Sequence, residues 1–135
     1  MAPLAFLVEG AIRDPRKLEE AFQTKLIDCV IHLAGKSLVA ESVAHPDRYE
    51  EANVGEGCVL LEAMRTHGVT DLVFSSTAAV YGSPLSSPIP EEALLRPENP
   101  YGASKAACEG LLREREEDSG LRFASLRYFN AAGAL

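Results

Sequence analysis

The sequence predicts an α/β fold, built on a doubly wound parallel sheet of about four strands with crossover helices. Two observations support this fold class. Short apolar runs rich in β-branched and aromatic residues alternate with segments of helical periodicity along the whole chain. The apolar runs are also nearly continuous, which is typical of parallel strands that are covered on both faces and joined by helices.

The four expected strands are residues 4–10, 28–35, 71–76 and 122–129, each of which is a short apolar run. At 135 residues, the chain is long enough for one domain with a single core. We therefore expect residues 1–135 to form one domain.

The expected helices are residues 14–23, 47–67 and 100–117. Asp14 and Asn99 are suitable N-cap residues, and each precedes a proline that can occupy the first helical position. Gly68 ends the middle helix, and an extra turn is expected within 37–44. Between Gly82 and Pro100 lies a loop that is too polar and too rich in proline for regular structure.

Composition excludes several classes of partner. The net charge of −7, from 20 acidic and 13 basic residues, argues against nucleic acid and against an anionic membrane surface. No apolar run approaches the roughly 18 residues of a membrane span, and the Met1 segment lacks the features of a signal peptide, so we expect a cytoplasmic protein. The three cysteines lack metal-ligand spacing, so we expect buried packing residues and no metal site.

The segment "NPYGASK" at 99–105 places Tyr101 and Lys105 one turn apart on one face of a helix. A tyrosine is a poor base at neutral pH, but a nearby ammonium favours its phenolate. Thr77 follows a strand, at the sheet edge where open parallel sheets bind ligands, and its hydroxyl could hold a substrate alcohol. Alternatively, the tyrosine and lysine are a common helical pair with a solvent-directed lysine.

Four segments together resemble the extended short-chain dehydrogenase/reductases: "VIHLAG" at 30–35, "FSSTAAVYG" at 74–82, "NPYGASK" at 99–105 and "LRYFNAAGA" at 126–134. Within that family the pattern is most similar to that of the sugar-nucleotide 4-epimerases. The resemblance extends from about Val8 to the last residue. It implies a Rossmann-type, NAD(P)-binding domain.

The resemblance also implies roles for individual residues. Tyr101 resembles the catalytic base, Lys105 the residue that assists it, and Thr77 the residue that binds the sugar hydroxyl. The implied cofactor-binding residues are Ala34, Gly35, Lys36, Asn53, Ser75, Tyr101, Lys105 and Tyr128, and the implied substrate-binding residues are Thr77, Tyr101 and Asn130. Without the resemblance, Asn53 would be interpreted as a polar residue on a helix surface.

The implied activity interconverts UDP-glucose and UDP-galactose through a transient 4-keto sugar, with bound NAD as cofactor and a UDP-sugar as substrate. Related dehydratases usually carry an Asp-Glu pair directly after the position of Thr77, because elimination of water needs an acid and a base. Here those positions are Ala78 and Ala79. The comparison favours epimerisation over dehydration.

Two parts of the expected family pattern are missing. No glycine-rich turn joins a first strand to a helix, and Ala11 stands where relatives usually have an aspartate near the adenine. We also expect the chain to lack the C-terminal substrate domain, so the expected fold is a partial Rossmann-type sheet. The epimerase activity would then need a complementing chain. The alternative function is a non-catalytic domain with no turnover alone, which acts, if at all, by assembly with a partner, for example as a homo-oligomer. Segment 4–10 must then pair with 28–33, stay apart from it, or pair with another chain.

Overall fold

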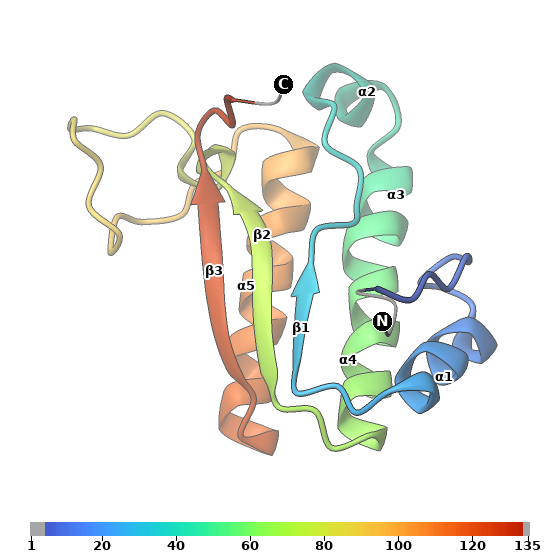
Figure 1. The fold of residues 1–135 in the computed structure, drawn as a ribbon. Coiled ribbons are helices and arrows are strands. Elements are labelled where there is room, and N and C mark those ends of the chain that lie inside the picture. Colours follow the sequence, from blue (N-terminus) through green and yellow to red (C-terminus); the bar gives the residue numbers. More distant parts are fainter. Residues whose placement is uncertain (1–4, 134–135) are drawn as a thin grey trace.

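A computed structural model describes residues 5–133 and contains a parallel sheet of three strands. The strands are β1 (Cys29–His32), β2 (Asp71–Thr77) and β3 (Arg122–Tyr128), in the order β1-β2-β3 (Figure 1). Because all three run in the same direction, their carboxyl ends meet at one edge, where Thr77 pairs with Tyr128. The partial Rossmann-type α/β fold expected from the sequence is confirmed.

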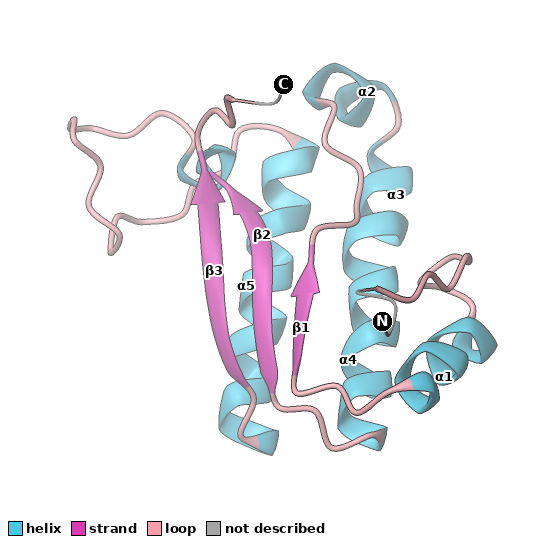
Figure 2. Cartoon of the chain, viewed as in Figure 1, coloured by secondary structure: helices cyan, strands magenta, loops and turns pink. Residues whose placement is uncertain are grey.

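The helices expected at 14–23 and 100–117 are formed, whereas the helix expected at 47–67 contains a π-helical segment (Figure 2). Asp14 accepts a hydrogen bond from the Arg16 amide at 3.0 Å, and Asn99 accepts one from the Gly102 amide at 2.8 Å, so both expected N-caps are formed. The helical elements are α1 (Pro15–Thr24), α2 (Val39–Ala44), α3 (Pro46–Tyr49), a π-helical segment (Glu50–Gly55), α4 (Glu56–Thr66), a 3₁₀ helix (Ala78–Tyr81) and α5 (Pro100–Ser119).

The hydrophobic core lies between the sheet and the two long helices, α4 and α5 (Figure 1). Leu72 and Phe74, at alternate positions of β2, point toward these helices and are buried. The side chains that pack around them include Leu60, Leu61 and Met64 of α4 and Cys108 and Leu112 of α5. Burial of these apolar surfaces stabilises the arrangement of helices on strands.

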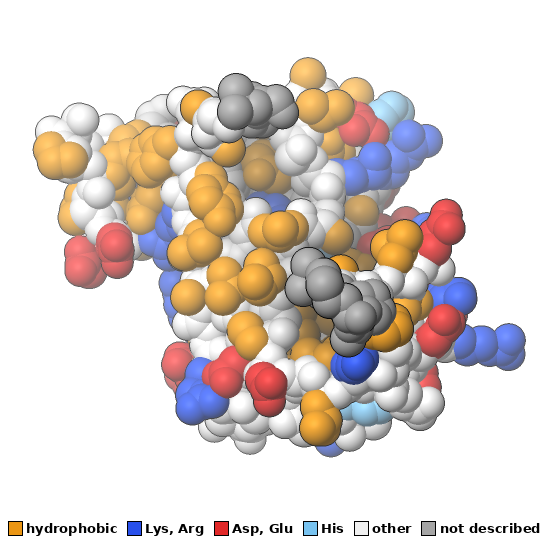
Figure 3. Space-filling view, viewed as in Figure 1, with side chains coloured by type: hydrophobic (Ala, Val, Ile, Leu, Met, Phe, Trp, Pro, Cys, Tyr) orange, Lys and Arg blue, Asp and Glu red, His pale blue; other side chains and the backbone are white. Residues whose placement is uncertain are grey.

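The opposite face of the sheet carries no helix within residues 5–133. This differs from the expectation, because the nearly continuous apolar runs predicted strands that are covered on both faces. Ile31 is 64% exposed, Leu126 is 41% exposed and Tyr128 is 45% exposed. Figure 3 shows hydrophobic side chains gathered over this face. Both crossovers step in the same direction, from β1 toward β3. Because right-handed crossovers that step in one direction place their helices on the same face of a sheet, α4 and α5 cover one face only.

The prediction of a strand at 4–10 was wrong for residues 5–10, which are the part that the structure describes, because they contain no strand. This segment folds back on α1 instead: Lys25 Nζ lies 4.8 Å from the centre of the Phe6 ring, and Gly10 packs tightly on Lys17. Of the three alternatives left by the sequence, the segment therefore stays apart from β1 within this chain. β1 keeps one unpaired edge because the described residues supply no neighbouring strand there.

Two of the three cysteines also differ from the expectation. Cys108 is buried, but Cys29 and Cys58 are exposed. Cys29 lies on the sheet face that no helix covers, and Cys58 borders the groove between α1 and α4. In the described part of the chain, no helix combines the length and the apolar character that crossing a bilayer requires.

Candidate functional site

Thr77 lies at the carboxyl end of β2, directly beside the start of α5. Its Oγ1 accepts a hydrogen bond from the Ala79 amide at 3.2 Å and thereby caps the 3₁₀ helix. A Cβ at Gly102 would lie only 2.6 Å from the Ala79 carbonyl oxygen, so the first turn of α5 packs directly on this backbone. Glycine at position 102 permits the close approach of the two segments that carry Thr77 and Tyr101.

Lys105 is buried beneath this edge, with only 5% of its surface exposed. Its Nζ donates a hydrogen bond to the Ser75 carbonyl at 2.9 Å and lies 4.8 Å from the centre of the Phe74 ring. Burial lowers the pKa of Lys105, and among residues 5–133 no carboxylate lies within ion-pair distance of it. The ammonium therefore keeps an attraction for any negative charge that develops nearby.

Asn53 joins three segments of the site through its carboxamide. Its Oδ1 accepts from the Lys36 amide at 2.8 Å, and its Nδ2 donates to the Lys36 carbonyl at 3.1 Å and to Ser104 Oγ at 2.9 Å. Asn53 lies in the π-helical segment and is buried, so its interpretation as a helix-surface residue was wrong. π-Helical turns are often found at functional sites.

Gly35 follows β1 and has a φ of 142°, a conformation that favours glycine. A Cβ there would lie 2.8 Å from Asn53 Oδ1 and 3.5 Å from Lys105 Nζ. The strand end, the amide of Asn53 and the ammonium of Lys105 therefore form one compact cluster. A side chain at position 35 would fill the space in front of it.

Tyr101 lies in the first turn of α5 and is partly exposed. Its ring meets the ring of Tyr49 edge to face, with centroids 6.4 Å apart, and its carbonyl accepts from Ser104 Oγ at 2.8 Å. The Tyr49 hydroxyl is held by the backbone of Leu38, through a 2.7 Å bond to its carbonyl and a 3.0 Å bond from its amide. Tyr49 thus packs beside the candidate base, although it was not among the predicted site residues.

The remaining predicted residues lie at the same edge but outside this cluster. Lys36 directs its Nζ to Glu41 at 3.0 Å, so only its backbone borders Asn53. Tyr128 and Asn130 lie at and beyond the end of β3 and are exposed, as is Ala34 after β1. The structure therefore groups Gly35, Asn53, Ser75 and Lys105, and places Tyr101 and Thr77 on the adjoining first turn of α5 and end of β2. It leaves Ala34, the Lys36 side chain, Tyr128 and Asn130 at the rim.

Two buried ionisable groups, His32 and Glu109, lie near the site and were not among the predicted site residues. Burial lowers the pKa of His32 to about 4, with a further contribution from the Lys105 ammonium. Burial opposes ionisation of Glu109, but hydrogen bonds from Arg127 and Ser76 outweigh it and lower the carboxyl pKa. The spacing of Glu109, four residues after Lys105, was the available signal, since it places both on one helix face.

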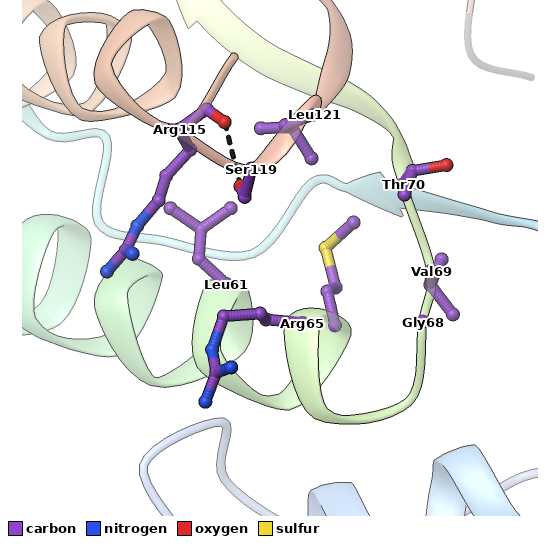
Figure 4. Close-up of a pocket in the computed structure, with 9 residues that line it drawn as sticks. Leu61, Arg65, Gly68, Val69, Thr70, Arg115, Ser119 and Leu121 are labelled. Atoms are coloured by element: carbon purple, nitrogen blue, oxygen red, sulfur yellow. Dashed lines mark hydrogen bonds between the residues drawn. The ribbon is translucent and has the colours of Figure 1, made fainter. Parts of the chain in front are cut away.

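A separate cavity of about 240 Å³ lies between the ends of α4 and α5 (Figure 4). Thr70 and Leu121, which line it, directly precede β2 and β3. The cavity is therefore at the amino edge of the sheet, at the opposite end from Thr77 and Tyr101. Its Arg65 is already paired with Glu62, at 2.6 Å.

Comparisons of sequence identify relatives of this chain. A UDP-glucose 4-epimerase from Halalkalibacterium halodurans is 50% identical over 125 residues, which are 93% of this chain and 37% of that protein. A UDP-glucose 4-epimerase from Streptomyces lividans is 48% identical over 131 residues, which are 96% of this chain and 40% of that protein. The chain thus spans about two fifths of the length of these curated relatives.

Solved structures agree with the sequence matches. UDP-glucose 4-epimerase from Brucella ovis, in complex with NAD, superimposes with a TM-score of 0.91 at 42% identity, over 94% of this chain and 39% of that one. The enzyme from Bifidobacterium longum, in complex with NAD+ and UDP, gives a TM-score of 0.86 at 43% identity, over 90% and 37%. The predicted resemblance to the epimerases of the extended short-chain dehydrogenase/reductases is confirmed.

The family model described as GDP-mannose 4,6 dehydratase matches residues 2–135. This match includes every strand and helix of the fold and the whole cluster around Lys105. The chain therefore belongs to the GDP-mannose 4,6 dehydratase family.

Proposed function

We propose that this chain carries the proton-transfer residues of an NAD-dependent UDP-sugar 4-epimerase, which interconverts UDP-glucose and UDP-galactose through a 4-keto sugar. The observation that carries the proposal is the buried Lys105, which is anchored on the Ser75 carbonyl one helical turn from Tyr101. Thr77 lies at the end of the same strand. The names of the relatives support the choice of reaction.

Each of the three side chains has a distinct task in this reaction. Tyr101 takes the proton from the sugar hydroxyl and returns it, and the Lys105 ammonium favours the phenolate form. Thr77 Oγ1 already accepts from the Ala79 amide, so its own O–H is available to bind the same sugar hydroxyl. Bound NAD supplies the redox chemistry at C4.

The residues present fit one end of the cofactor better than the other. Gly35, Asn53, Ser75 and Lys105 lie together at the carboxyl edge, one helical turn from Tyr101, and the region in front of them suits the nicotinamide and its ribose. Ala34, the Lys36 backbone and Tyr128 border it, and Asn130 is placed to contact the UDP-sugar. The sequence contains no glycine-rich turn for the pyrophosphate, so we expect NAD to bind this chain weakly or undetectably.

Epimerisation is favoured over dehydration by the residues that follow Thr77. Ala78 and Ala79 begin the 3₁₀ helix, and neither can act as the acid or the base that elimination of water requires. The family name includes dehydratases, but these two alanines argue for a reaction that needs only the tyrosine as proton carrier.

The second candidate is a non-catalytic domain that acts by assembly with a partner or with another copy. The observation that favours it is the uncovered apolar face of the sheet, with the unpaired edge of β1 beside it. In that case Tyr101 and Lys105 are retained without turnover.

The two candidates separate in one set of measurements on the purified chain. NAD affinity is measured by calorimetry, and conversion of UDP-galactose is measured at saturating UDP-galactose and high NAD. If the chain is catalytic, Tyr101→Phe lowers turnover at least about 100-fold and leaves NAD affinity unchanged, because only the proton transfer is removed. Lys17→Met, on the exposed surface of α1, is the control and leaves both unchanged.

Equal losses of turnover and NAD affinity in Tyr101→Phe would identify a structural tyrosine. Absence of turnover in the folded wild-type chain at high NAD would favour the non-catalytic candidate. A monodisperse monomer that binds NAD at micromolar affinity would show that the chain contains a phosphate site without a glycine-rich turn.

A further inference from the structure

Glu109 is a fully buried carboxylate on the face of α5 that carries Tyr101 and Lys105. Its Oε1 accepts from Ser76 Oγ at 2.6 Å and from Arg127 Nε at 3.0 Å, and its Oε2 accepts from Arg127 Nη2 at 2.7 Å. The carboxylate is therefore bonded on both oxygens, and the arginine contact is bidentate.

Arg127 extends this network beyond the helix. It lies opposite Ser76 in the pairing of β2 with β3. Its Nη1 donates to the Tyr81 hydroxyl at 2.6 Å and to the Glu91 carbonyl at 2.8 Å. One guanidinium thus connects α5, the end of the 3₁₀ helix and the proline-rich loop that leads into α5.

Two polar contacts fix the position of α5 along β2. Lys105 bonds to the Ser75 carbonyl, and one turn later Glu109 bonds to the Ser76 hydroxyl. Thr77 is the next residue of the strand, and Tyr101 lies one turn before Lys105 on the helix. Sliding the helix along the strand would break both contacts and would change the separation of Tyr101 from Thr77.

We propose that the buried Glu109–Arg127 pair is a positioning device, which holds α5 in register on β2 and so fixes how the first turn of α5, with Tyr101, lies relative to the end of β2 at Thr77. This inference rests on the proposed function for its catalytic meaning. The register itself is a structural property and can be measured without turnover. Glu109 and Arg127 are positioning residues, because neither belongs to the Tyr101, Lys105 and Thr77 set.

A purely stabilising role makes a different prediction from a positioning role. Removing one member of a buried ion pair strongly destabilises a fold, whereas replacing both by apolar residues of similar size is often neutral. The double variant Glu109→Met/Arg127→Met should therefore recover stability relative to either single variant. It cannot restore the bond to Ser76, so the register should remain disturbed.

The test combines urea unfolding with amide NMR spectra of the full chain. We expect Glu109→Gln to shift the amide signals of Thr77, Ala79, Tyr101 and Gly102, and we expect the double methionine variant to keep those shifts while its unfolding midpoint recovers. Leu112→Ala is the matched control: it lies on the same helix, is buried in the core and has no side-chain group that can hydrogen-bond or ion-pair with the network. It should lower the midpoint and leave the four signals in place.

If Glu109→Gln does not fold, Ser76→Ala provides the same test, because it removes one contact of the carboxylate and leaves the ion pair. Return of the four signals to their wild-type positions in the double variant would overturn the proposal, as would equal shifts in Leu112→Ala. Turnover is measured on the same samples. If the wild-type chain turns over, turnover of the double variant should be about 100-fold lower, because misplaced catalytic groups lose about this much rate. If the wild-type chain does not turn over, the proposed function fails, while the result on the register of α5 still stands.

Discussion

The junction of α5 with β2 and the uncovered face of the sheet differ in almost every physical respect. At the junction, Lys105, Glu109 and Ser76 are buried and hydrogen-bonded across elements far apart in the sequence. On the uncovered face, Ile31 and Leu126 are apolar and largely in contact with solvent (Figure 3). The comparison teaches that the polar contacts between α5 and β2 are satisfied within this chain, while one face of the sheet lacks, within residues 5–133, the cover that parallel sheets normally have.

The largest expected contrast is in stability. Leu72→Ala, on the covered face of β2, should lower the free energy of unfolding by about 2–5 kcal/mol, because it leaves a cavity between α4 and α5. Ile31→Thr, on the uncovered face of the neighbouring strand, should change it by less than about 0.5 kcal/mol. Urea unfolding followed by circular dichroism measures both. Similar losses in the two variants would mean that the open face is covered in solution.

The second-largest expected effect is a dependence of stability on pH, which arises from His32 on the covered face of the sheet. The pKa of His32 is lowered to about 4 from its usual 6.5, so the unfolded chain binds the proton more readily than the folded one. The contribution of His32 to the free energy of unfolding is fully present above pH 6.5 and is lost as the pH falls toward 4. This loss lowers the free energy of unfolding by about 3 kcal/mol. Glu109, whose pKa is lowered, adds a further loss at lower pH.

His32→Leu should flatten the stability curve between pH 6.5 and pH 4 and leave the loss below that range. The measurement is urea unfolding at a series of pH values. A curve unchanged by the substitution would mean that His32 ionises freely in the folded chain and that another group dominates this range.

The uncovered face should be visible in self-association. We expect the wild-type chain to self-associate, because the apolar face and the unpaired edge of β1 are both available. Ile31→Thr combined with Leu126→Thr should weaken association about tenfold, which corresponds to about 1.4 kcal/mol. Size exclusion with light scattering over a range of concentrations provides the measurement. Ala103→Thr, an exposed position on α5, is the control and should leave the association constant at its wild-type value.

The smallest expected contrast concerns two N-caps of the same type. Asn99→Ala removes the cap of α5 at the junction and should cost about 1–2 kcal/mol, whereas Asp14→Ala removes the exposed cap of α1 and should cost about 0.5–1 kcal/mol. Thermal unfolding of the two variants makes the comparison. A larger loss from Asp14→Ala would show that α1 and the segment before it contribute more to the fold than their exposure indicates.

Local chemistry in the sequence was sufficient for much of the fold. The Asn99-Pro100 and Asp14-Pro15 pairs identified two helix starts, and the apolar runs at 71–76 and 122–129 identified two parallel strands, because caps and strand patterns depend on near neighbours. The motif residues Tyr101, Lys105 and Thr77 could likewise be chosen from spacing and resemblance. Their meeting at one edge follows from the parallel direction of the strands.

Other features were decided only by tertiary structure. Residues 4–10 have the composition of a strand, but a strand forms only where a partner supplies hydrogen bonds, and the described chain places none beside it. Asn53 and Glu109 look like surface polar residues in sequence. Their burial depends on partners 51 and 18 residues away, Ser104 and Arg127. The spacing of Glu109 from Lys105 places both on one helix face, but it does not identify Arg127 as the partner. The sequence by itself determined the helix starts, the strands β2 and β3 and the motif residues that the chain carries. Long-range packing decided whether residues 5–10 form a strand, which polar groups are buried and which face of the sheet stays open, because all three depend on contacts between segments far apart in the chain.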